Sequence, residues 1–184
     1  MQRPTQCESG ASAKRASRAA LASALLLLVL ARASEPAAAD ETRIRMMLVT
    51  PDGVGPTIGT MRAGDGGDGL RLAPLFKDLA PGAHAAAIHA NGDCGPAEKD
   101  GRKIAAGAAG DPFQPTKADL SGPAADKPPP VLRPFVLAVG ADGIARTVVT
   151  VPQAKLAMIR GRSIVVEEGP AGGAAVACGV IPAS

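Results

Sequence analysis

The stretch GRSIVVEEGPAGGAAVACGVI, residues 161–181, decides the fold of this 184-residue chain. It contains two runs of β-branched and small apolar residues, 162–167 (RSIVVE) and 174–181 (AAVACGVI), with glycine and proline between them. Runs of this kind, bounded by residues that favour turns, predict short strands. We therefore expect two strands at the C-terminal end of the chain.

The same pattern extends back to residue 42, and little 3.6-residue periodicity accompanies it. Six further runs have strand character, and Gly, Asp and Pro separate them: 42–50, 57–63, 69–75, 84–90, 134–139 and 144–151. Asp142-Gly143, between the last two runs, predicts a hairpin turn. Eight short strands predict an all-β fold, either a sandwich or a barrel.

One long interval interrupts this rhythm. Residues 95–133 contain charged residues, Ala, Gly and several prolines, among them the run Pro128, Pro129 and Pro130. A loop of this length inside a compact domain is typically functional or flexible.

Residues 1–39 are predicted to be a signal peptide and short leader. Basic residues precede an apolar run at 19–31, and small residues follow it, which predicts cleavage after Ala33 or Ala39. The remainder, 40–184, is expected to form one domain. Because the apolar run is too short to span a bilayer and no longer run follows, we expect an exported protein without a membrane span, periplasmic or extracellular.

The charge balance beyond the leader excludes one class of partner. The chain has 20 Lys and Arg and 17 Asp and Glu, and five of the former and two of the latter lie in the leader, so the rest is neutral. It also contains no Trp or Tyr. A neutral domain without stacking aromatic residues is not expected to bind nucleic acid.

Two cysteines remain after the predicted cleavage, Cys94 and Cys178, because Cys7 lies in the leader. A cysteine pair in an exported chain predicts a disulfide. Two buried free thiols are the alternative.

Two segments resemble the signature regions of copper/zinc superoxide dismutases: LAPGAHAAAIHANGDC, residues 79–94, and the stretch 161–181. Supporting segments occur in the family's order: IGTM (58–61), GLRLAPLFKDL (69–79), DGRKIAAGAAGDPF (100–113) and VGADGIA (139–145). The resemblance covers nearly the whole predicted mature chain. It implies an eight-stranded Greek-key β-barrel, and Cys94 and Cys178 match the two cysteines of the family's disulfide.

Several metal ligands that the resemblance implies are replaced. The two copper-binding histidines of the first signature are matched by Ala87 and His89, and Pro112 stands where the histidine that bridges copper and zinc is expected. Glu167 matches the last copper-binding histidine. His84 matches a histidine whose role in the family is structural.

The zinc ligands have no clear counterparts either. Residues 118–134 contain no histidine, and their only carboxylates are Asp119 and Asp126. Ala175 matches the arginine that guides superoxide in the family, and the connection 168–172 is too short for the usual electrostatic loop.

The count of histidines argues against the family's standard site, which needs six, because the whole chain has two. His84 and His89 are five residues apart, so on a regular strand they point to opposite faces and cannot chelate one metal together. His89, with Glu167, is predicted to keep at most a residual metal contact. No catalytic residue and no other cofactor-binding residue is predicted.

These observations favour an exported, non-enzymatic domain that uses the barrel as a scaffold for an unidentified protein partner in the cell envelope. No cofactor is expected under this hypothesis. Two alternatives stay open, and copper and zinc are expected only under them: a superoxide dismutase, converting superoxide to oxygen and hydrogen peroxide at an atypical metal site, and a weak copper-binding envelope protein. The sequence makes no prediction of the oligomeric state.

Overall fold

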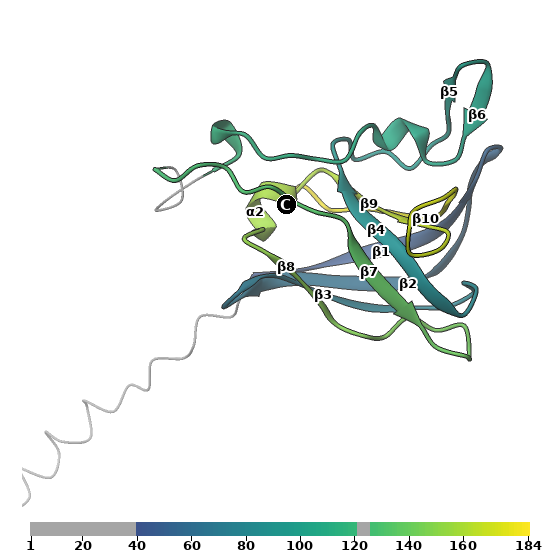
Figure 1. Ribbon diagram of the computed structural model, residues 1–184, viewed down its shortest axis with the longest axis horizontal. Coiled ribbons are helices and arrows are strands. Elements are labelled where there is room, and N and C mark those ends of the chain that lie inside the picture. Colours follow the sequence, from purple (N-terminus) through teal and green to yellow (C-terminus); the bar gives the residue numbers. More distant parts are fainter. Residues whose placement is uncertain (1–39, 121–125) are drawn as a thin grey trace, which may run out of the picture. The chain divides into compact units, whose positions relative to one another are not determined.

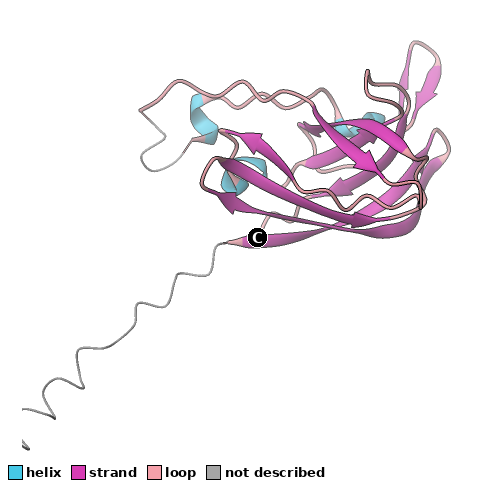
Figure 2. Ribbon diagram, turned by 60° about the horizontal axis from the view of Figure 1, so that its bottom comes forward, coloured by secondary structure: helices cyan, strands magenta, loops and turns pink. Residues whose placement is uncertain are grey.

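The computed structural model describes residues 40–120 and 126–184. The predicted leader, with its cleavage points after Ala33 or Ala39, lies outside the described residues. Almost all regular structure in the described part is β-strand, with only short helical turns (Figure 2). No helix in that part is long and apolar enough to cross a membrane.

Eight strands form one antiparallel sheet that curls into a nearly closed barrel (Figure 1). The strands are β1 (Glu41–Thr50), β2 (Gly53–Gly66), β3 (Gly69–Phe76), β4 (Gly82–His89), β7 (Phe135–Val139), β8 (Val149–Pro152), β9 (Ser163–Glu167) and β10 (Ala175–Val180). They follow the order β7-β4-β9-β10-β1-β2-β3-β8. The predicted all-β, eight-stranded Greek-key fold is confirmed.

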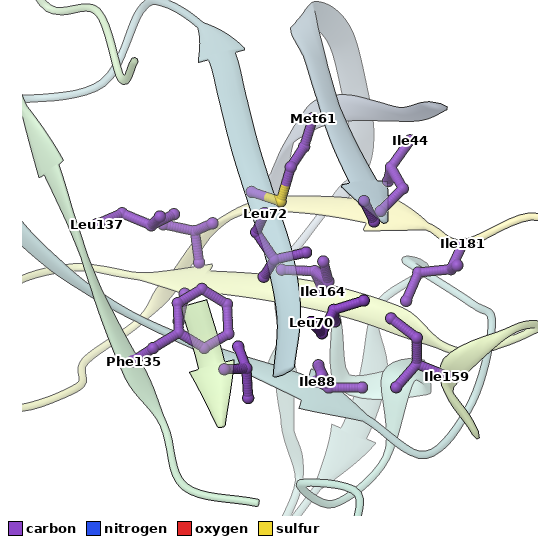
Figure 3. Close-up of a cluster of buried hydrophobic side chains, with 14 of the residues drawn as sticks. Ile44, Met61, Leu70, Leu72, Ile88, Phe135, Leu137, Ile159, Ile164 and Ile181 are labelled. Carbon is purple, nitrogen blue, oxygen red and sulfur yellow. The ribbon is translucent and has the colours of Figure 1, made fainter. Parts of the chain in front are cut away.

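The barrel interior follows from side-chain alternation along each strand. In β1, Ile44 and Met46 are fully buried while Arg45 between them is exposed, and β7 buries Phe135 and Leu137 in the same way. Residues two apart in a strand share a face, so one face of each strand supplies the core. Figure 3 shows Ile44, Phe135 and Leu137 in a cluster of apolar side chains that come from different strands.

The hairpin predicted at Asp142-Gly143 is wrong. A turn forms there, and the Gly143 N–H donates to the Gly140 carbonyl at 2.9 Å, but β7 pairs with β4 and β8 pairs with β3. In the connection from β7 to β8, Ala145 makes two isolated β-bridges, one to Phe76 and one to Val139. The turn signal is local, whereas strand pairing depends on which edges the rest of the barrel leaves open.

The described part of the interval 95–133 contains short regular elements that the sequence did not predict. These are β5 (Ala97–Lys99), paired with β6 (Arg102–Ile104), and the two 3-10 turns η1 (Gly107–Ala109) and η2 (Lys117–Asp119). A further single-turn helix, α2 (Leu156–Ile159), follows β8. In Figure 1 the segment that carries β5 and β6 passes over one end of the barrel.

A disulfide ties this interval to the barrel. Cys94 and Cys178 are bonded, with Cα atoms 5.7 Å apart, so the predicted disulfide is confirmed over the alternative of free thiols. Both cysteines are buried in a small apolar cluster that includes Val49, Ala109 and Val165. The bond therefore connects the start of the long interval to β10.

An arginine holds a later part of the same interval. Arg162, immediately before β9, donates to Asp119 Oδ1 at 2.6 Å and to the Ala90 carbonyl at 3.1 Å. Its guanidinium also lies over the Phe113 ring, 3.4 Å from the centroid. A planar guanidinium can make all these contacts at once, so Arg162 links three segments that are distant in sequence.

Hydrogen bonds keep the Asp119 carboxylate ionised. The Thr116 backbone N–H and hydroxyl both donate to Asp119 Oδ2, each at 2.8 Å. These two bonds first, and then Arg162, lower the pKa of Asp119 below its ordinary value of 3.8, although partial burial opposes the shift.

Removing the disulfide is expected to destabilise the fold strongly. The bond joins residues 84 positions apart, and closing a loop of that size restricts the unfolded chain by about 4–5 kcal/mol in the chain-entropy model. We expect the double variant Cys94→Ala, Cys178→Ala to lose about that much unfolding free energy in urea titrations. A reduced wild-type protein should match it, and a loss below about 1 kcal/mol would contradict the expectation.

The Asp119 contacts predict a pH-dependent contribution to stability. Because the folded-state pKa is depressed, the contribution is complete above the unfolded value of 3.8 and is lost as the pH falls through the folded pKa. We expect Asp119→Asn to cost about 1–2 kcal/mol at pH 7 and progressively less below pH 4, in urea titrations of variant and wild type.

Asp126→Asn is the matched control, since Asp126 is exposed and has no ion pair with a described residue. It should leave the unfolding free energy unchanged at every pH. A cost of Asp119→Asn that does not vary between pH 7 and pH 2 would show that its carboxylate charge is irrelevant.

Candidate functional site

A cleft of about 370 Å³, here called the His89 cleft, lies at the end of β4, between strands β9 and β10 on one side and β6 with the residues that follow it on the other. His89, Glu167 and Ala175 line it, and each matches a functional position of the family signatures. Lys103 lines it as well, and the remaining walls are mostly small apolar residues. Positions far apart in the sequence therefore meet in one cleft.

His89 is held in a fixed orientation. Its Nδ1 lies 2.7 Å from the Gly110 carbonyl oxygen, and the residue is only 9% exposed. Since a carbonyl can only accept, Nδ1 carries the proton in this contact, and in the neutral ring Nε2 keeps a lone pair. A histidine that donates one N–H to a backbone carbonyl is oriented as metal-binding histidines are.

Glu167 is the second donor in the cleft. It ends β9 and pairs in register with Ala175 of β10, while Glu168, the first residue after the strand, is exposed. Its Oε2 lies against the tight turn before β10, where a Cβ added to Gly172 would come within 2.7 Å of it. The absence of a side chain at Gly172 thus leaves room for the carboxylate.

The other positions of the expected copper site surround His89 but offer no donor. Pro112 forms an isolated bridge with His89, and Ala87, two residues earlier in β4, shares its face. A methyl group and a pyrrolidine ring cannot bind a metal. The fold therefore places the family's positions together, and the residue types at these two differ.

His84 lies outside this arrangement. Its Nδ1 is 3.0 Å from the Glu167 carbonyl oxygen and its Nε2 is 2.8 Å from the Ala80 carbonyl oxygen, and the residue is 3% exposed. Both nitrogens are occupied by backbone contacts, so the structural role predicted for His84 is confirmed. It fastens β4 to the end of β9.

The two carboxylates considered as zinc ligands are not brought into the cleft. Asp119 is held by Thr116 and Arg162, and Asp126 is exposed; neither lines the cleft. Sequence reasoning missed the role of Lys103 at the cleft and of the Gly110 carbonyl beside His89. Both lie in the quoted segment 100–113, but nothing in the sequence indicated that this segment folds back onto β4.

Comparison with known proteins identifies the same family. The family model for copper/zinc superoxide dismutase (SODC) matches residues 57–181. The protein named superoxide dismutase [Cu-Zn] 2 from Salmonella typhimurium is 37% identical over 174 residues, which cover 85% of this chain and 96% of the relative. The superoxide dismutase [Cu-Zn] of Escherichia coli K12 is 35% identical, with 86% and 96% covered.

A solved structure agrees with these sequences. The Cu/Zn superoxide dismutase from Brucella abortus superposes with a TM-score of 0.65 at 34% identity, covering 77% of this chain and 99% of that one. The two chains therefore share the barrel as well as the sequence pattern.

These similarities correct two expectations drawn from the sequence. The hypothesis of a non-enzymatic scaffold is contradicted, because relatives matched over almost their whole length are named as superoxide dismutases. The expectation that the chain takes no cofactor is contradicted by the same names, which point to copper and zinc. Both expectations gave too much weight to the histidine count.

The side chains of the His89 cleft that could bind a metal nevertheless do not fit the copper and zinc centre that the family's name implies. A catalytic zinc site takes about three protein ligands, and redox copper sites use imidazole or sulfur donors. In residues 40–120 and 126–184, no three His, Cys, Asp or Glu side chains are grouped so that they could hold a metal. His89 and Glu167 supply two donors, and both sulfurs of the described cysteines are in the disulfide.

The family match does not depend on that donor set. It rests on the order of the signature segments, the eight-stranded Greek-key topology, the disulfide and the extent of the sequence identity. The chain belongs to the copper/zinc superoxide dismutase family.

Proposed function

We propose that the chain is a superoxide dismutase with an atypical metal site at the His89 cleft. Its reaction converts two superoxide anions and two protons into one oxygen molecule and one hydrogen peroxide molecule. The observation that carries the proposal is the 35–37% identity to proteins named copper-zinc superoxide dismutases, over 85–86% of this chain and 96% of theirs.

The geometry of the cleft supports the proposal in three respects. The Gly110 carbonyl orients His89 so that Nε2 keeps a lone pair, and Glu167 adds a carboxylate to the same cleft. Lys103 contributes the one Lys or Arg side chain that lines it within the described part of the chain. A cation at the cleft would attract an anionic substrate such as superoxide.

Two donors are fewer than a tightly held metal needs, so the proposal requires further ligands from water or from a partner chain. The carboxylate of Glu167 is also a harder donor than the imidazole that the resemblance implies there. Both features predict weaker metal retention than an all-histidine site would give.

We also propose that the protein is exported to an oxidising compartment. Residues 1–39 have the charge and hydropathy layout of a signal peptide. The Cys94–Cys178 disulfide supports the same conclusion, since structural disulfides persist mainly outside the reducing cytosol.

The decisive experiment combines metal content with superoxide consumption. The protein, produced from the full-length sequence and recovered from an oxidising compartment, is loaded with copper and zinc, dialysed, and analysed by elemental mass spectrometry. Superoxide decay is then followed by stopped flow with a chelator present to remove free copper. We expect bound copper and superoxide decay faster than in buffer.

Substitutions of residues in the His89 cleft test whether the activity lies there. His89→Ala should lower both the retained copper and the decay rate at least about tenfold, as expected for loss of an oriented imidazole ligand. Glu167→Gln should lower both less, and its neighbour Glu168→Gln, which is exposed, is the matched control and should leave both unchanged.

Each other outcome has a definite meaning. A folded protein that holds no copper and consumes no superoxide would overturn the proposed activity. Copper that is retained through His89 without superoxide consumption would instead identify a copper-binding protein. Activity that survives His89→Ala would place the reaction elsewhere on the molecule.

A further inference from the structure

A second hollow of about 700 Å³ lies between the proline-rich segment before β7 and the segment that follows β8. Pro128, Pro129 and Pro130 form one wall, and the buried side chains of Leu120 and Met158 provide an apolar surface within it. We call this hollow the proline groove. It shares no lining residue with the His89 cleft.

Three cations line the proline groove, Lys127, Arg133 and Lys155, and no carboxylate of residues 40–120 or 126–184 lines it. None of the three forms a salt bridge with a residue that the structure describes. The Lys155 ammonium makes one long contact, 3.4 Å to the Gly66 carbonyl oxygen. Because the chain beyond its leader is neutral overall, this is a local excess of positive charge.

The carboxylates on or beside the segments that form the groove do not line it. Asp119 is held by Arg162 and Thr116, and Asp65 Oδ1 accepts the Leu156 backbone N–H at 2.8 Å. Asp126 is exposed and does not line the groove. The cations of the groove are therefore available to an anionic ligand.

The groove adjoins the gap between the two free strands of the barrel. A smaller hollow of about 290 Å³ lies between β7 and β8 and shares Val131, Arg133 and Gln153 with the proline groove. β7 and β8 end the strand order, so each pairs with one neighbouring strand only, and on its other side β7 makes a single bridge, from Val139 to Ala145. An extended peptide binds to such an edge through backbone hydrogen bonds.

The junction of the two hollows carries local backbone strain and an exposed apolar side chain. Gln153 has a φ of +62°, a conformation that costs a residue other than glycine roughly 1 kcal/mol or more and that is common at binding sites. Val131 is 70% exposed at the same place. An exposed aliphatic side chain beside a cationic groove favours a ligand that is both acidic and apolar.

We propose that the proline groove and the adjoining hollow bind an acidic, extended peptide segment of a partner protein. Apolar side chains of the segment would pack on Leu120 and Met158, and its carboxylates would pair with Lys127, Arg133 and Lys155. The groove's prolines have no backbone N–H, so side-chain charge and the β8 edge supply the polar contacts. This interaction is independent of the proposed dismutase activity, because the two sites share no residue.

The test uses a fluorescein-labelled hexapeptide in which acidic residues flank a Leu-Val pair, and a second peptide with lysines at the acidic positions. Fluorescence anisotropy with the protein produced from the full-length sequence should show saturable binding of the acidic peptide. The lysine peptide should bind at least about tenfold more weakly, and added salt should weaken the acidic peptide's binding.

The double variant Lys127→Glu, Arg133→Glu should reduce the affinity for the acidic peptide at least about tenfold. Lys99→Glu, Arg102→Glu is the matched control, because it makes the same charge change at exposed positions of the β5–β6 hairpin, and it should leave the affinity within about twofold. Should the first variant fold poorly, backbone amide shifts of the wild type on peptide addition give the same answer. They should be largest at Gln153 and in β8.

Three results would overturn the proposal. The first is that the acidic peptide does not bind at millimolar concentration. The second is that both charge variants lower the affinity for the acidic peptide equally, which would indicate a response to net charge alone. The third is that free glutarate displaces the peptide at a low glutarate concentration while the peptide causes no amide shifts along β8. That result would indicate a site for small anions and no peptide site.

Discussion

The pairing of β4 with β9 is the interaction on which the rest of the structure depends. It joins residues 74 to 80 positions apart, with Ile88 opposite Ile164 and His89 opposite Ser163. Ile88 and Ile164 enter the barrel core, while the end of β4 places His89 near the end of the sheet at which the long interval folds back. His84 strengthens the same junction through the Glu167 carbonyl. This pairing therefore contributes residues to both the core and the His89 cleft.

Covalent and polar contacts fix the long interval where the family resemblance implies metal ligands. The disulfide holds its start, and Arg162 holds its middle through Asp119 and Phe113. The disulfide makes the larger contribution, about 4–5 kcal/mol, because it restricts the unfolded chain, whereas a partly exposed ion pair usually contributes about 1 kcal/mol or less. The loop can thus keep its position without depending on a bound metal for its shape.

The site combines a family framework with an unusual donor set. Relatives at 35–37% identity carry the names of copper-zinc enzymes, and the chain keeps a histidine at His89, which the Gly110 carbonyl orients. Pro112 and Ala87 occupy neighbouring positions without donor atoms. Similarity establishes the family and favours its reaction, whereas the number of donors determines how firmly a metal is held.

The sequence by itself determined the all-β class, the Greek-key barrel of the family and the cysteine pair, since these follow from local patterns and from the signature segments. The hairpin predicted from the sequence at Asp142-Gly143 was wrong, because a turn signal does not tell which strands pair. Only the tertiary structure decided that Gly110 orients His89, that Arg162 reaches Asp119, and that the cations of the proline groove meet beside β8. Such contacts join residues distant in sequence, and their positions depend on how the whole barrel closes.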